Sequence, residues 1–189
     1  YPSVVDDDTW PVPALSYGAE KLACEVLIAD YTRRGLLQGR VVRLPSIVAR
    51  PRMRVGAASA FSSEIIRELA RGESYVCPVS AGATHWLMSL DCCLDALLRA
   101  SELPADAFGP HLVVNLPPVH CTTDDLVRAV AARFGSEIAG RVRYAPDPTL
   151  EAIFGQFPPM HTPRAVAAGL VGDGTVAALV ERAIAASTK

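Results

Sequence analysis

The chain has 189 residues, half of them hydrophobic, and a net charge of −2 with an isoelectric point near 6.1. This length and composition suffice for a sizeable core, so we expect one globular domain, or one domain with a small cap. The charge gives no electrostatic reason to bind nucleic acid or an anionic membrane surface, and every apolar run is too short to cross a bilayer.

Residues 1–13 hold three consecutive aspartates and three prolines, which predicts an irregular acidic loop. A helix is expected from Ser16 to Gly35, because apolar residues recur at helical spacing, Ser16 can cap its start and Gly35 can end it. Residues 39–51 contain a near-continuous apolar run, which is typical of a strand buried on both faces, and Pro45 would end that strand. Helix, short loop and buried strand in succession are half of a parallel crossover unit, so the predicted fold class is α/β.

Apolar periodicity beyond residue 51 predicts several short elements. Ser89 and Thr122 are the expected caps of two of the helices, the second as part of a capping box with Asp125. Strands are expected at 75–79, 85–88, 111–116 and 141–144, and helices at 58–71, 91–101, 123–134, 149–154, 163–168 and 175–186.

The five cysteines and four histidines are scattered along the chain. The number of cysteines is odd and no two have Cys-x-x-Cys spacing, so we expect reduced thiols in a cytoplasmic protein. The histidines form no cluster in the sequence, so we expect no metal site.

Tyr17 and Lys21 are four residues apart at the start of the first expected helix, which makes them neighbours on its surface. A nearby ammonium favours the phenolate over the phenol, so this tyrosine can act as a general base on an alcohol. Such a pair arises by chance with a probability of roughly 5%, so it is informative but insufficient alone. The chain has two lysines against sixteen arginines, and an ammonium can approach both a phenol and a ribose hydroxyl.

Oxidation of an alcohol also needs a hydride acceptor, and a bound nicotinamide dinucleotide normally requires a glycine-rich turn between a strand and a helix. The most similar segment is 169–174, with glycines at 169, 172 and 174. It follows an expected helix instead of a strand, so we interpret it as a loop.

The segments Ser16-Tyr17-Gly18-Ala19-Glu20-Lys21 and Arg43-Leu44-Pro45-Ser46-Ile47 resemble the catalytic helix and following strand of the extended short-chain dehydrogenase/reductase superfamily, the NAD-dependent epimerase/dehydratase group. Later segments resemble its D-erythronate dehydrogenase branch, and together the matches cover nearly the whole chain. These later segments are Arg33-Arg34-Gly35, Arg50-Pro51, Ala57-Ala58-Ser59, Ile65-Ile66-Arg67-Glu68, Cys77-Pro78-Val79, His85-Trp86 and Asn115-Leu116-Pro117.

The resemblance implies the C-terminal part of a Rossmann-type doubly wound parallel sheet with a small α+β substrate-binding domain. Residues 1–51 would be a remnant of the dinucleotide-binding domain, and residues 52–189 would be mostly the substrate-binding domain, with some elements returning to the Rossmann core. The family's glycine-rich half and its catalytic Ser or Thr would precede Tyr1, so we expect this chain alone to be catalytically inactive.

The resemblance also implies a role for each site residue. Tyr17 would take the hydroxyl proton of a small hydroxy acid such as D-erythronate, and Lys21 would hold the nicotinamide ribose. NAD binding would involve Tyr17, Lys21, Leu44, Pro45, Ser46 and Ile47, and substrate binding Ser59, His85 and Trp86, with further donors from the loop 50–54. Trp86 and His85 can instead belong to the core, and exposed arginines are often merely solvated.

Two other functions stay open on the sequence. One is an epimerase or reductase of nucleotide sugars from the same superfamily. The other is a catalytically silent interaction module. Extended members of the superfamily commonly form homodimers through the helix equivalent to residues 17–34, so the enzyme and module interpretations both predict a dimer.

Overall fold

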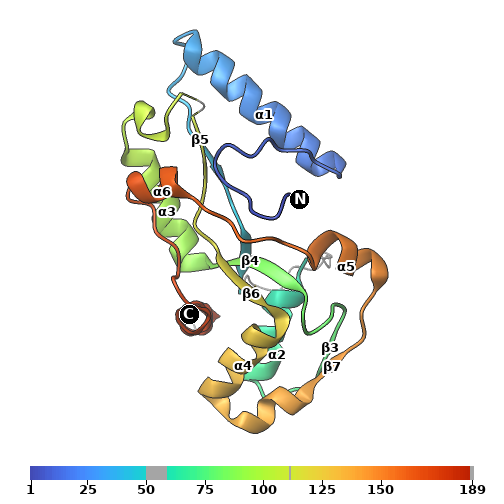
Figure 1. Cartoon of the computed structure of the whole chain (residues 1–189). Helices are drawn as coiled ribbons and strands as arrows, with labels where there is room; N and C mark the ends of the chain where they lie inside the picture. The colour runs from blue at the N-terminus through green and yellow to red at the C-terminus, as the bar shows by residue number, and fades with distance from the viewer. Residues whose placement is uncertain (50–58, 111, 188–189) are drawn as a thin grey trace.

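The computed structural model describes residues 1–49, 59–110 and 112–187. Its architecture is mixed α/β with parallel strand pairing, as the sequence predicts (Figure 1). The described strands form three short sheets instead of one continuous sheet. β1 (Val41–Arg43) is parallel to β5 (Val113–Asn115), β3 (Tyr75–Cys77) is parallel to β7 (Val142–Tyr144), and β4 (Thr84–Ser89) lies between parallel β2 (Ser46–Val48) and antiparallel β6 (Val119–Thr122).

The apolar run predicted as one buried strand is in fact two strands in different sheets. Pro45 lies between β1 and β2 and has no backbone N–H to donate to a ladder, so the pairing changes there. β1 is also only half-buried, so the prediction of burial on both faces is wrong for it. In the β1–β5 register Arg43 is opposite Asn115, which places the carboxyl ends of both strands at one edge.

Seven α-helices and two 3₁₀ helices connect the strands within the described residues. The α-helices are α1 (Ser16–Arg33), α2 (Phe61–Ala70), α3 (Leu90–Glu102), α4 (Thr123–Phe134), α5 (Pro148–Phe154), α6 (Pro163–Ala167) and α7 (Val176–Ser187), and the 3₁₀ helices are η1 (Ala105–Phe108) and η2 (Ser136–Arg141). In this part of the chain no helix is both long and apolar enough to cross a bilayer.

Two of the three predicted N-caps are confirmed. The Ser89 hydroxyl accepts a hydrogen bond from the backbone of Cys92, and Thr122 forms a reciprocal capping box with Asp125. The prediction for Ser16 is wrong, because the helix has already begun there: Leu15 is the N-cap of α1 and offers no side-chain acceptor. At the other end, Gly35 follows the helix with φ +72°, a conformation that glycine adopts without strain.

Two hydrophobic clusters form the core. The larger packs α2, α4 and α7 against β4 and β6, with Ile65, Leu69, Leu87, Leu126 and Leu179 among its fully buried side chains. The smaller surrounds α3 and β5 and includes Met88, Cys93, Phe108, Val114 and Leu170. The boundary expected between residues 51 and 52 lies outside the described residues.

α1 belongs to neither cluster. Figure 1 shows it at the top of the molecule, in blue, away from the helices of the main body. None of its 18 residues is buried, and the apolar side predicted from the sequence is largely exposed, with Tyr17, Val26, Leu27 and Tyr31 each at least 44% accessible. The two core clusters therefore contribute little to holding α1 in place, and specific contacts at its ends and along its length become important.

Candidate active site

Tyr17 and Lys21 are neighbours on α1, as their spacing predicts. The Nζ atom of Lys21 lies 5.4 Å from the centroid of the Tyr17 ring, which is within the range of a cation–π contact. Both side chains are exposed, Tyr17 at 69%. The arrangement leaves the phenol open to a ligand and places a positive charge beside it. Its catalytic role stays a prediction.

The predicted cofactor segment, Leu44 to Ile47, leaves the carboxyl end of β1 and enters β2. Leu44 is 48% exposed, and Pro45 turns the chain between the two sheets. The carboxyl ends of parallel strands are where open α/β folds bind ligands, so the position suits the predicted role. The loop 50–54, predicted to supply further donors, lies outside the described residues.

An ion pair that the sequence analysis missed connects α1 to β1. The guanidinium of Arg43 donates to both carboxylate oxygens of Glu25, from Nε at 2.9 Å and from Nη2 at 2.7 Å. The two side chains are 28% and 14% exposed, so the pair is more sheltered than the other ion pairs of α1, Arg33–Asp30 and Arg34–Asp30. Two features of the sequence could have indicated this pair: Arg43 is a charge inside an apolar strand, and Glu25 is an acid one helical turn after Lys21.

A cleft of about 230 Å³ lies between α1, the β1–β5 sheet and the N-terminal loop. α1 contributes Leu22, Glu25, Val26 and Ala29 to its wall. Tyr17 is not among the lining residues, because it lies about 140° around the helix from Leu22. Tyr17 is therefore on a different side of α1 from the cleft, whereas Lys21 is one helical turn before the cleft residue Glu25. The other residues that line the cleft are Asp7, Asp8, Thr9, Trp10, Pro11, Arg43, Val113, Asn115 and Arg164.

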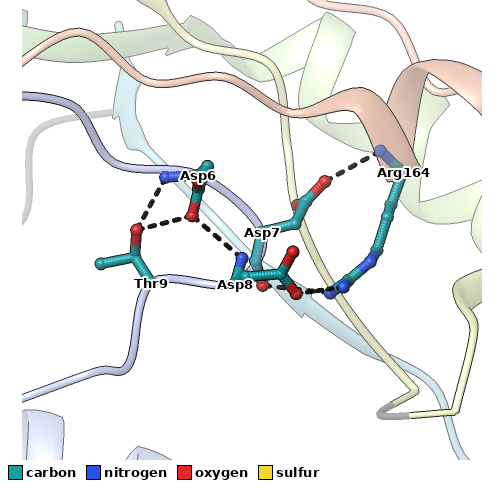
Figure 2. A network of polar contacts seen from close by, with 5 residues as sticks. All are labelled: Asp6, Asp7, Asp8, Thr9 and Arg164. Carbon is teal, nitrogen blue, oxygen red and sulfur yellow. Dashed lines mark hydrogen bonds and ion pairs between the residues drawn. The ribbon is translucent and has the colours of Figure 1, made fainter.

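The acidic N-terminal loop is irregular, as predicted, but its carboxylates are engaged instead of merely solvated (Figure 2). Asp6 accepts hydrogen bonds from the hydroxyl of Thr9 at 2.7 Å and the backbone of Asp8 at 3.1 Å, and the first of these bonds holds the Asp6 pKa below its usual range. Arg164, at the start of α6, donates its backbone N–H to Asp7 Oδ2 at 2.8 Å and pairs its guanidinium with Asp8. These bonds fix the loop that forms one wall of the cleft.

His85 is buried, and both of its ring nitrogens are used within the protein. Nδ1 lies 3.0 Å from the carbonyl oxygen of Phe154, and Nε2 lies 2.8 Å from the hydroxyl of Thr123. A carbonyl can only accept, so Nδ1 carries the proton and the neutral ring accepts from Thr123 at Nε2. Burial lowers the pKa of His85 to about 4. In this arrangement no ring nitrogen is left for a substrate, so the structure favours the core alternative for His85.

Trp86 and Ser59, the other two predicted substrate residues, take no part in the hydrogen bonds of His85. The indole N–H of Trp86 donates to the carbonyl of Pro158 at 2.6 Å, and its ring packs against those of Tyr1 and Phe157, with centroids 5.4 and 4.7 Å away. Ser59 is half-buried in the turn that leads to α2. Their contact with a substrate stays a prediction. Within the described residues no three His, Cys, Asp or Glu side chains are arranged to hold a metal ion.

Comparisons with known proteins give sequence and structural relatives, although no family model matches the chain. It is 39% identical over 175 residues to a D-erythronate dehydrogenase of Cupriavidus necator, covering 92% of this chain and 54% of that protein. It is 34% identical over 157 residues to a D-erythronate dehydrogenase of Haemophilus influenzae, covering 83% of this chain and 50% of that protein. The chain therefore spans about half the length of the curated relatives it matches.

Solved structures agree on the fold. A nucleoside-diphosphate-sugar epimerase from Agrobacterium tumefaciens superposes with a TM-score of 0.87 at 27% identity, over 95% of this chain and 53% of that one. The holo form of a GalE-like L-threonine dehydrogenase from Cupriavidus necator gives 0.85 at 22% identity, over 98% and 60%, which shows the fold alone. The resemblance found in the sequence is confirmed. Over about half of their length, this chain is a relative of the D-erythronate dehydrogenases, within the NAD-dependent epimerase/dehydratase group of the extended short-chain dehydrogenase/reductase superfamily.

Proposed function

We propose that this chain is the tyrosine- and lysine-bearing part of an NAD-dependent oxidoreductase that oxidises a hydroxyl of a small hydroxy acid such as D-erythronate. The observation that carries the proposal is the exposed Tyr17 ring with the Lys21 ammonium 5.4 Å from its centroid. The substrate class comes from the two relatives named D-erythronate dehydrogenase.

In this proposal Tyr17 is the general base. Its phenolate oxygen takes the proton of the substrate hydroxyl. The Lys21 ammonium stabilises the negative charge of this phenolate before the proton is transferred. Bound NAD would supply the hydride acceptor. Lys21 would also hold the nicotinamide ribose by hydrogen bonds, and the backbone from Leu44 to Ile47 would border the nicotinamide at the carboxyl end of β1.

The residues of this chain fit only one end of NAD. The exposed Tyr17, Lys21 and Leu44 suit the nicotinamide end. For the diphosphate, no glycine-rich turn connects a strand to a helix in the part of the chain that the structure describes. The segment 169–174 connects α6 to α7, so the prediction that it is a loop is confirmed. The proposal therefore assigns the diphosphate contacts to the remainder of a longer enzyme, in line with the share of the relatives that the chain spans.

Two assays test the proposal. In the first, the isolated chain is titrated with NADH, and we expect weak or no binding and no turnover of D-erythronate. In the second, the chain is fused to the part of the Cupriavidus necator dehydrogenase that its match does not cover, and we expect reduction of NAD with D-erythronate. A folded fusion that binds NADH but oxidises none of a panel of small hydroxy acids would contradict the proposal.

A second candidate follows from the superposition on the nucleoside-diphosphate-sugar epimerase. Under this alternative the same tyrosine and lysine act on the hydroxyl of a nucleotide sugar. The fused enzyme distinguishes the two, because turnover of a nucleotide sugar without turnover of D-erythronate would favour the epimerase.

We also propose that α1 mediates a homodimer. Leu27 and Tyr31 are 56% and 44% exposed on this helix and do not line the cleft. A second copy of α1 would cover these apolar side chains. If the dimer forms but the fused enzyme is inactive, the silent module is the better interpretation.

A further inference from the structure

We propose that Glu25 and Arg43 form a positioning pair that sets the place of the Tyr17–Lys21 face relative to the segment Leu44 to Ile47. The inference rests on the proposed function for its catalytic consequence, but its structural part stands on the contacts of α1 alone. Neither residue is a catalytic residue in this account, because neither contacts the reacting groups.

Few other described contacts hold α1 in place. No residue of the helix is buried. At its C-terminal end the return loop approaches closely at Gly39, whose backbone N–H donates to the Thr32 hydroxyl at 2.9 Å. At its N-terminal end Pro13 contacts Gly18: a Cβ added there would lie 3.0 Å from the Cβ of Pro13. Between these two ends, the side-chain bond that the structure describes from α1 to β1 is the Glu25–Arg43 pair.

The Glu25–Arg43 pair is bidentate and therefore directional. A guanidinium that donates two parallel bonds to one carboxylate fixes both the distance and the orientation of its partner. The pair is also sheltered, with Arg43 and Glu25 at 28% and 14% exposure, compared with 74% and 35% for Arg128 and Asp124 on α4. Solvent screens it less than an ordinary surface ion pair.

The pair connects α1 to the end of β1. Glu25 is one helical turn after Lys21 on α1, and Arg43 is the last residue of β1, immediately before Leu44. One fork of hydrogen bonds therefore joins the element that bears the proposed base to the strand that leads into the proposed cofactor segment. Displacing α1 by about 1 Å would lower a rate that depends on this geometry by about a hundredfold.

The structural test measures the position of α1 in the isolated chain and needs no cofactor. Cys24 on α1 is exposed and the other four cysteines are buried, so a spin label attaches there selectively, and Val76→Cys on the exposed side of β3 supplies the second label. The distance distribution between the labels is then recorded for Glu25→Gln, Arg43→Lys, Arg43→Met and the double variant Glu25→Gln/Arg43→Met. Asp124→Asn, in the exposed α4 pair, is the matched control.

We expect each single variant to widen or shift the distribution, the double variant to add little to either, and Arg43→Lys to fall between the wild type and Arg43→Met. This non-additivity is the signature of one shared interaction. Distributions like that of the wild type in both Glu25→Gln and Arg43→Met would overturn the inference, as would an equal effect of Asp124→Asn. Thermal unfolding of each variant shows whether the main body is unchanged, and Arg43→Lys gives the result if Glu25→Gln does not fold.

The catalytic consequence of the Glu25–Arg43 pair is measured in the fused enzyme. We expect kcat with D-erythronate to fall by about a hundredfold in Glu25→Gln, with partial recovery in Arg43→Lys relative to Arg43→Met and no change in melting temperature. An unchanged kcat in an active fusion would overturn this part. A fusion that is inactive with the native residues would contradict the proposed function and not the positioning of α1, which the distance measurement decides.

Discussion

Acidification should destabilise this protein because the ring of His85 is buried in its neutral form. The ring has a pKa of about 4 in the folded chain because it is buried, against 6.5 when exposed. Between these values the unfolded chain binds a proton that the folded chain does not, so stability is lost as the pH falls from 6.5 towards 4. The two pKa values differ by an amount worth about 3 kcal/mol, a large part of the stability of a domain of this size.

The carboxylates with lowered pKa values act in a different range. Hydrogen bonds hold the pKa of Asp6 and Asp125 below 3.8, so the stability that they contribute is lost only below that value. The loss between pH 6.5 and about 4 therefore reports on His85.

Urea unfolding at a series of pH values gives the free energy of unfolding for the native chain, for His85→Gln and for the exposed control His161→Gln. We expect the native chain and the control to lose about 3 kcal/mol across this range and His85→Gln to lose much less. Equal losses in all three proteins would show that His85 is not the group responsible. If His85→Gln does not fold, NMR titration of the His85 ring decides, since a midpoint near 6.5 would contradict burial as the dominant cause.

Two further predictions concern α1. Gly39→Ala should destabilise the docking of α1 by about 1–3 kcal/mol, because the added Cβ would lie 2.3 Å from Cγ2 of Ile28. Gly82→Ala is the control and should have little effect, because no atom lies within 4 Å of its added Cβ. Hydrogen exchange of the α1 amides measures the difference, and equal protection of these amides in the two variants would contradict the close packing of Gly39 on Ile28. Leu27→Glu should shift a dimer towards monomer, as measured by light scattering at fixed protein concentration. The control Leu98→Glu on α3 should not, although Leu98 is 66% exposed. A dimer that persists in Leu27→Glu would exclude α1 as the interface.

Local signals in the sequence located most of the helices. Ser89 and Thr122 marked the starts of α3 and α4 because a side-chain cap depends only on residues three positions away. The N-cap prediction for Ser16 was wrong, because it relied on residue type alone: serine suits a cap, but Leu15 occupies the N-cap position of α1. β6 was missed because its alternation spans only four residues, too few to distinguish a strand from a loop.

Long-range partners were not available from the sequence. Pro45 indicated where a strand ends, but nothing local indicated that the next three residues pair in a different sheet. The environment of His85 depends on Phe154 and Thr123, which are 69 and 38 positions away, so its buried role could not be separated from a substrate contact. The Tyr17–Lys21 contact was predictable because one helical turn determines it.

If Tyr17, beside Lys21, is the base of an alcohol oxidation, removing its hydroxyl should slow that reaction, and the chain offers a matched control. Tyr31 is also an exposed tyrosine of α1, and it too has a cation nearby, with Cζ of Arg34 5.9 Å from its ring centroid. The measurement is the rate of hydride transfer from D-erythronate to NAD in the fused enzyme, compared between Tyr17→Phe and Tyr31→Phe. We predict that Tyr17→Phe lowers this rate by about 100- to 10,000-fold and that Tyr31→Phe leaves it unchanged. Equal rates in the two variants would show that Tyr17 is not the base.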